Sequence, residues 1–191
     1  YDAKADYWKG EVPLKHLCIQ EITDSNTAVV ALQTGELDLY FGSVSGTAYD
    51  TLSTADNVKL EEFLSCRNEG YFMNVQKGIF TDVRMRQAVA YAVSKADALT
   101  VAVDGMGETI QYPGDIGSLM AGNPDTPPSV TYDQDLEKAK ALVEEAGMTG
   151  ADVVISSYTT EPYATLGTYL QSVLTEIGLN ATVEQMERAT F

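Results

Sequence analysis

The sequence predicts an α/β protein in which mainly parallel strands are joined by helical crossovers. Two observations support this fold class. Short runs of alternating or β-branched apolar residues recur along the chain, and segments with helical periodicity and recognisable end residues lie between them. Parallel strands need a long crossover, usually a helix, so this order is typical of parallel sheets. With 191 residues, 45% of them apolar, the chain can bury a core in one domain or two small lobes.

The first third of the chain predicts a β-α-β-α-β succession. Alternating apolar and polar residues predict strands at 14–22, 37–41 and 58–64. Between the first two, Asp24 or Ser25 begins a short helix, because either side chain can accept hydrogen bonds from the first helical amides. Gly35 ends that helix as a left-handed cap. A small helix is expected within 43–53.

The rest of the chain predicts further helices and a second strand–helix–strand unit. The expected elements are an extended stretch at 66–76, helices at 83–94, 95–103, 136–146 and 161–177, and strands at 153–155 and 180–186. Asp135 begins the third of these helices, and Gly147 and Gly178 stop the last two. Several prolines exclude regular structure from 111–132, which is either a functional loop or a surface wrap.

The run Phe80–Lys95 predicts a mostly buried helix with Asp82 at its start, since apolar residues occupy two stripes of it. Arg84 and Arg86 are its charged exceptions. They could bind a ligand carboxylate, but salt bridges that hold the helix to its loop are the favoured interpretation.

Composition excludes several functions. A net charge of −16 repels phosphate backbones and anionic membrane faces, so no nucleic-acid partner is expected. His16 is the only histidine, and Cys18 and Cys66 lack metal-ligand spacing, so neither a metal nor a cofactor is expected. The two cysteines could form a disulfide, but buried free thiols are favoured. The sequence contains no GxSxG, P-loop or HExxH motif and no apolar run long enough to span a membrane.

Five segments in order resemble motifs of the family 5 extracellular solute-binding proteins, the peptide- and nickel-binding receptors of ABC importers. They are DYWKG at 6–10, ALQTGELD at 31–38, NVQK at 74–77, FTDVRMRQAVAYAVSK at 80–95 and LEKAKALVEEAG at 136–147. The resemblance implies a type II, two-lobe periplasmic-binding-protein fold, of which this chain would be an internal fragment. Residues 1–67 would then belong to the first lobe, 68–76 to a crossover strand, and 77–191 to the first part of the second lobe.

The same resemblance implies an extracytoplasmic protein, periplasmic or anchored as a lipoprotein. It would capture short peptides or a nickel chelate and deliver them to permease subunits. It would not be an enzyme. Two alternatives remain open from the residues alone, namely a small α/β enzyme and a ligand-sensing domain fused to a regulatory protein. Unpaired sheet edges on such a fragment would also favour a homodimer.

Candidate ligand-binding residues follow from position. Open α/β sheets bind ligands at the carboxyl ends of strands, glycine permits close backbone approach, and aromatic rings offer flat apolar faces. The candidates are Tyr40, Phe41, Gly42 and Ser43 after one strand, Gly70, Tyr71, Phe72 and Asn74 in the crossover, Gln111 and Tyr112 in the long loop, and Tyr158 after a strand of the second unit. For Tyr71 and Phe72, packing in the core is the favoured alternative.

Overall fold

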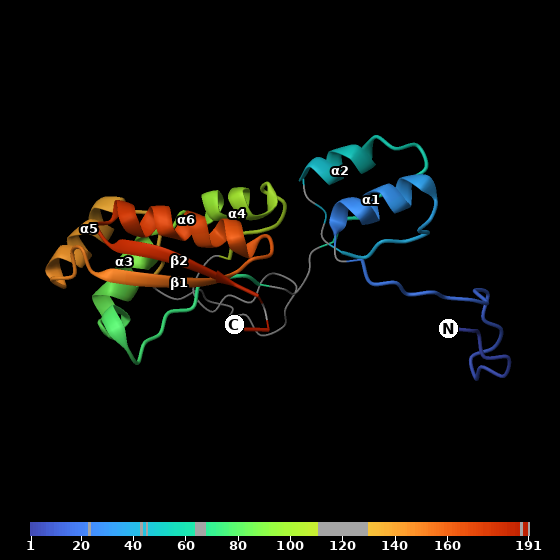
Figure 1. Ribbon diagram of the computed structural model, residues 1–191, viewed down its shortest axis with the longest axis horizontal. Coiled ribbons are helices and arrows are strands. Elements are labelled where there is room, and N and C mark those ends of the chain that lie inside the picture. Colours follow the sequence, from blue (N-terminus) through green and yellow to red (C-terminus); the bar gives the residue numbers. More distant parts are fainter. Residues whose placement is uncertain are drawn as a thin grey trace. The chain divides into compact units, whose positions relative to one another are not determined.

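The computed structural model describes residues 1–22, 24–42, 44, 46–63, 68–110, 130–187 and 189–190. The chain consists of two compact units, Tyr1–Leu60 and Glu61–Phe191. Helices and a parallel strand pair are both present (Figure 1), so the α/β class predicted from the sequence is confirmed. None of the helices in the described ranges is long and apolar enough to cross a bilayer.

The first unit contains two helices, α1 (Ser25–Thr34) and α2 (Gly46–Ser53). The Asp24 carboxylate accepts hydrogen bonds from the Thr27 backbone N–H at 2.8 Å and from its hydroxyl at 2.7 Å, which caps α1. Gly35 adopts a φ of 74° and ends α1, as predicted. The helices pack through a small core formed by Val29, Ala48 and Leu52.

The strands predicted for this unit are wrong for the residues that the structure describes. Segments 14–22, 37–41 and 58–63 have no assigned strand, and only Asp2 and His16 form an isolated antiparallel bridge. A strand needs a continuous ladder of backbone hydrogen bonds with a neighbour. In the described residues, 14–22 forms only the isolated bridge and a few backbone bonds to residues 1–3, and no ladder is assigned along 37–41 or 58–63. Several of their apolar side chains are exposed, for example Leu39 at 80%, whereas Val58 and Leu60 are partly buried against the small core.

The structure also corrects the expected burial of Cys18. Cys18 is a free thiol at an exposed position in the first predicted strand, so the expectation that it is buried is wrong. The segment that carries this side chain has no assigned strand, so it is not buried on the face of a sheet. Cys66 lies outside the described residues.

The second unit has the predicted helix order and strand–helix–strand arrangement. Its elements are η1 (Gly78–Thr81), α3 (Val83–Ala92), α4 (Lys95–Val103), α5 (Leu136–Glu145), β1 (Asp152–Tyr158), α6 (Tyr163–Glu176) and β2 (Asn180–Met186). The strands are parallel, with Asp152 opposite Asn180 and Tyr158 opposite Met186. The crossover stretch expected at 66–76 has no assigned strand within 68–76.

One core holds this unit together. Figure 1 shows α6 lying along the two strands, and the inward-facing Val153, Ile155 and Ala181 belong to the same buried cluster as Leu174 of α6. Helix α3 supplies Met85, which is 0% exposed, and three more buried residues. The sheet, α6 and α3 therefore share one apolar interior, as the buried character predicted for α3 requires.

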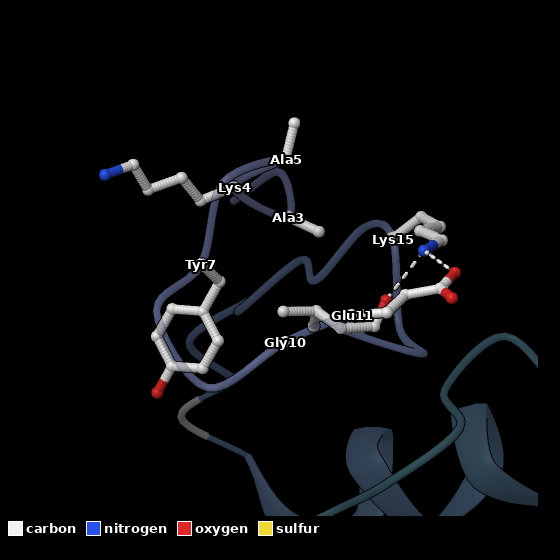
Figure 2. Close-up of a pocket in the computed structure, with 8 residues that line it drawn as sticks. Ala3, Lys4, Ala5, Tyr7, Gly10, Glu11 and Lys15 are labelled. Carbon is white, nitrogen blue, oxygen red and sulfur yellow. Dashed lines mark hydrogen bonds and ion pairs between the residues drawn. The ribbon is translucent and has the colours of Figure 1, made fainter.

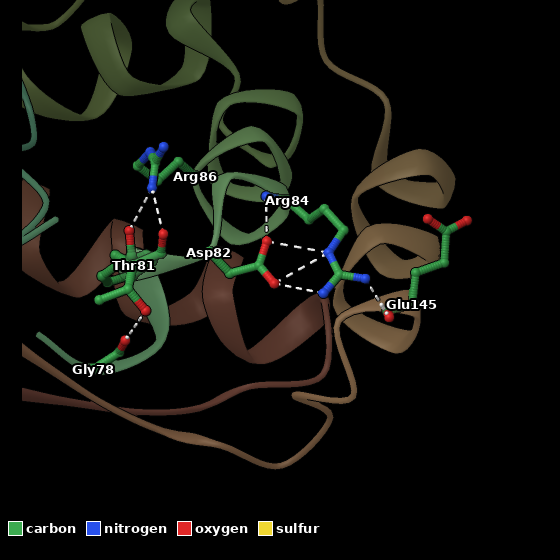
Figure 3. Close-up of polar contacts among 7 residues, drawn as sticks. Gly78, Thr81, Asp82, Arg84, Arg86 and Glu145 are labelled. Atoms are coloured by element: carbon green, nitrogen blue, oxygen red, sulfur yellow. Dashed lines mark hydrogen bonds and ion pairs between the residues drawn. The ribbon is translucent and has the colours of Figure 1, made fainter.

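Arg84 links the start of α3 to the end of α5 (Figure 3). Asp82 caps α3 by accepting a 2.8 Å hydrogen bond from the Arg84 backbone N–H, and its carboxylate also accepts bonds from the Arg84 guanidinium, the shortest being 2.5 Å. The remaining Arg84 nitrogen, Nη1, donates to the backbone carbonyl of Glu145 at 2.7 Å. A cation at this helix end satisfies an unpaired carbonyl and complements the helix dipole.

Arg86 holds the turn before the same helix. Its Nη1 donates to the carbonyls of Phe80 at 2.7 Å and Thr81 at 3.1 Å. Arg84 thus forms the kind of salt bridge expected from the sequence, whereas Arg86 holds the loop by hydrogen bonds to backbone carbonyls.

We expect Met85→Ala to lower the free energy of unfolding of the second unit by about 2–5 kcal/mol, because it leaves a cavity in a close-packed core. Urea unfolding followed by far-ultraviolet circular dichroism measures this. Met106→Ala is the matched control, since Met106 is 38% exposed, and should change stability by less than about 0.5 kcal/mol. Equal effects of the two substitutions would contradict the position of α3 in the core.

A second prediction concerns acid. Hydrogen bonds and charge from Arg84 lower the pKa of Asp82 to about 2, whereas the pKa of an aspartate in the unfolded chain is about 3.9. Because the folded pKa is the lower one, the stabilisation is complete above pH about 4 and is lost as the pH falls toward about 2. Stability measured across this window should fall more steeply for the wild type than for Asp82→Asn. Parallel profiles for the two proteins would refute the role of this carboxylate.

Candidate functional site

The carboxyl ends of β1 and β2 form the edge where a parallel sheet presents ligand-binding groups. Pairing continues one residue past the strands, since the Thr159 backbone N–H donates to the Met186 carbonyl at 3.2 Å. The Thr159 hydroxyl also donates to the Glu187 carboxylate at 3.1 Å. Polar side chains from the ends of both strands therefore lie together at this edge.

The first turn of α6 packs directly on that edge. The rings of Tyr158 and Tyr163 meet edge to face, with centroids 5.0 Å apart and planes at 87°. The buried Ser157 hydroxyl donates to the Tyr163 carbonyl at 2.5 Å. One turn further along, a Cβ on Gly167 would lie 3.1 Å from the Ser157 side chain, so the absence of a side chain there permits this close approach.

The segment 68–76 lies against the same helix. The Tyr163 hydroxyl donates to the Glu69 carboxylate at 3.1 Å, and the Tyr71 hydroxyl donates to the Leu166 carbonyl at 3.1 Å. Burial raises the pKa of Tyr71 far above its ordinary value, so this hydroxyl remains a donor. Tyr71 and Met73 pack against the core, whereas Phe72 between them is 98% exposed. This alternation is typical of an extended chain that rests on the unit with one face.

The predicted site residues of the second unit differ in their surroundings. Tyr158 and Tyr71 both contact the first two turns of α6, at Tyr163 and Leu166. Tyr71 is half-buried, which agrees with the core alternative, whereas Phe72 is not a core residue. Gly70 is exposed, with open space where a side chain would lie. Asn74 accepts a hydrogen bond from the Gln76 backbone N–H at 3.1 Å, as in a local turn.

The remaining candidates do not join this group. Tyr40, Phe41 and Gly42 belong to the other unit, where the half-buried Tyr40 ring lies over Gly42 and Phe41 is 79% exposed. The other three candidates, Ser43, Gln111 and Tyr112, lie outside the described residues. The ligand-binding role of every candidate remains a prediction.

Sequence reasoning missed Glu69 and Tyr163 as members of this group. The two residues are 94 positions apart, so no local spacing reveals the hydrogen bond between them. The one available signal was the place of Tyr163 in the first turn of a helix that follows a strand end.

Two surface hollows lie in the first unit. The larger, of about 440 Å³ (Figure 2), lies between 3–7 and 10–15, and the smaller, of about 300 Å³, is lined from 20–37. In the larger one the Lys15 amine is held by the Glu11 carboxylate at 2.9 Å and the Val12 carbonyl at 2.8 Å. Neither hollow contains a predicted site residue. Within the described ranges, no group of three or more His, Cys, Asp or Glu is arranged to hold a metal.

Comparison with known proteins gives a match along the whole chain. Residues 1–191 match the family described as bacterial extracellular solute-binding proteins, family 5 Middle. Among curated relatives, Heme-binding protein A of Haemophilus influenzae is 32% identical over 77% of this chain. Oligopeptide-binding protein AppA of Bacillus subtilis is 29% identical over 76%, and the nickel-binding periplasmic protein of Escherichia coli is 31% identical over 75%. The chain spans about a quarter of the length of these relatives, 26%, 26% and 27% respectively.

A solved structure agrees with this match. The periplasmic binding protein DppA from Helicobacter pylori, in complex with the peptide STSA, superposes with a TM-score of 0.78 at 25% identity. The similarity covers 99% of this chain and 36% of that one. The periplasmic-binding-protein-like fold expected from the sequence is therefore confirmed.

The inward and outward faces of 68–76 can be separated by stability measurements. Tyr71→Phe removes the hydrogen bond to Leu166 and should lower the free energy of unfolding by about 0.5–1.5 kcal/mol. Phe72→Ala removes a side chain that is 98% exposed and should change it by less than about 0.5 kcal/mol in the absence of ligand. A larger loss for Phe72→Ala than for Tyr71→Phe would show that the two faces are assigned the wrong way round.

Proposed function

Because the chain belongs to the bacterial extracellular solute-binding proteins of family 5, we propose that it is part of the extracytoplasmic receptor of an ABC importer. The receptor captures a short peptide outside the cytoplasm and delivers it to the membrane permease. The chain contributes binding and not catalysis. Residues 1–67 belong to one lobe, 68–76 to the crossover and 77–191 to the other lobe, and a lipid anchor on the whole protein is compatible with this role.

The observation that carries the peptide assignment is the free backbone of Phe72 and Met73 in the crossover segment. Among the described residues, the backbone N–H and C=O groups of Phe72 and Met73 have no hydrogen-bond partner. An extended peptide can supply such partners by adding alongside as a strand, and the side chains of the receptor then select among peptides. The exposed Phe72 ring offers an apolar face to a ligand side chain in that arrangement.

A peptide explains this arrangement better than the other ligand classes named for the relatives. A row of unpaired amides and carbonyls matches a peptide backbone group by group. A nickel chelate or a heme has no such repeating row of donors and acceptors. Support also comes from the oligopeptide-binding relative and the peptide-bound structure, both similar to this chain over most of its length.

Titration calorimetry of the whole protein with a mixed library of di- to pentapeptides tests the proposal. We expect saturable binding at micromolar affinity or tighter, since the site should bury most of a small ligand. Phe72→Ala should weaken it about tenfold or more. Phe63→Ala is the control of the same residue type, 69% exposed and outside 68–76, and should bind as the wild type does.

Two results would contradict the assignment. Saturable binding of nickel–histidine or heme without any response to the peptides would exclude the peptide class. If Phe63→Ala and Phe72→Ala weakened peptide binding equally, the crossover segment would not be part of the site.

A further inference from the structure

Among the described contacts of Tyr163, three join it to the end of β1 and to the crossover segment. Its backbone carbonyl accepts from the buried Ser157, its ring packs on Tyr158, and its hydroxyl donates to Glu69. The first two contacts fix Tyr163 on the carboxyl end of β1, and the third extends from there to the crossover segment. Tyr163 therefore joins two parts of the candidate site that are far apart in the sequence.

The crossover segment contacts α6 at two positions that are three residues apart on the helix. Glu69 contacts Tyr163, and Tyr71 contacts the carbonyl of Leu166. Residues three apart lie on one face of a helix, so the chain from Glu69 to Tyr71 follows the first turn of α6. The Tyr71 ring is additionally packed on the core, whereas Glu69 is exposed. The contact at Glu69 therefore fixes the chain on the amino-terminal side of Tyr71, and the core packing of Tyr71 and Met73 fixes it on either side of Phe72.

We propose that Tyr163 is a positioning residue for ligand binding. By donating to Glu69, its hydroxyl fixes the path of Gly70–Phe72, so that the Phe72 ring and the free backbone beside it face the ligand. This inference rests on the proposed function, because it assigns a role within the same site. It predicts that the hydroxyl acts through Phe72 and not by contact with the ligand.

The same helix provides a matched control. The Tyr169 hydroxyl also joins α6 to a neighbouring segment. It donates to the Ser94 carbonyl and accepts from the Ser94 backbone N–H, both at 3.1 Å. Those bonds hold α4 and not the crossover segment. Tyr169→Phe therefore removes an equivalent group from α6 without changing the contact at Glu69.

A double-mutant cycle on the whole protein tests the inference, with Ser-Thr-Ser-Ala and the mixed di- to pentapeptide library as probes. Tyr163→Phe should raise Kd about three- to tenfold, as expected for one lost hydrogen bond. In the Phe72→Ala background it should have almost no further effect, because a residue that acts through another is coupled to it. Glu69→Gln keeps an acceptor oxygen and should retain most of the affinity. Tyr169→Phe should leave Kd unchanged.

Proteolysis without ligand tests the positioning role of Tyr163 independently of the proposed function. Chymotrypsin should cleave after Phe72 at least about threefold faster in Tyr163→Phe than in the wild type, since loss of an anchor favours local opening. Cleavage after the exposed Phe41 of the other unit is the internal reference and should not change. If no probe binds the wild type, the proposed function fails, and the cleavage rates still decide whether Tyr163 positions the segment. Unchanged cleavage, or additive effects on Kd in the cycle, would overturn the inference.

Discussion

The second unit depends on the pair of charges at the start of α3. Asp82 and Arg84 each perform two tasks, since the carboxylate caps α3 and receives the guanidinium, and the guanidinium also reaches the last carbonyl of α5. Both contacts join opposite charge to a helix end, which helix dipoles favour. Because α3 contributes Met85 and its neighbours to the shared core, fixing this helix against α5 also fixes the surface on which α6 and the strands pack. The polar contacts set the direction of the helices, and apolar burial supplies most of the cohesion.

Features determined by neighbours in sequence were predictable from the sequence. Asp82 and Asp135 each begin a helix as predicted, and Asp24 begins one as the first of the two residues proposed for its cap, since a capping side chain bonds to amides only two or three residues ahead. The parallel pair β1 and β2 was also predictable, because its helix lies between the strands and the apolar pattern of all three elements agrees. The strand predictions for the first unit were wrong because strand pairing depends on residues that are distant in sequence. Their alternating patterns are real, but a strand needs a ladder of backbone bonds with a partner, and for these segments the described chain shows only the isolated bridge of Asp2 and His16.

The candidate site also depends on contacts between residues that are far apart in the sequence. Gly70, Tyr71, Phe72 and Tyr158 were chosen as candidates by position, but the sequence could not separate the inward ring of Tyr71 from the outward ring of Phe72. That distinction depends on which face of an extended segment rests on α6. The contact between Glu69 and Tyr163 spans 94 residues, and the one between Arg84 and Glu145 spans 61. Contacts of this kind arise from tertiary packing and leave no spacing in the sequence to recognise.

The order of elements along the chain also has a kinetic consequence. The unit β1–α6–β2 is contiguous, and the other parts of its core, on α3 and α5, precede it in sequence. Contacts between elements close in sequence form fastest, since little loop entropy is lost in closing them. During synthesis the apolar faces of α3 and α5 would therefore be available before β1 emerges. We expect β1, α6 and β2 to condense onto that surface as one step.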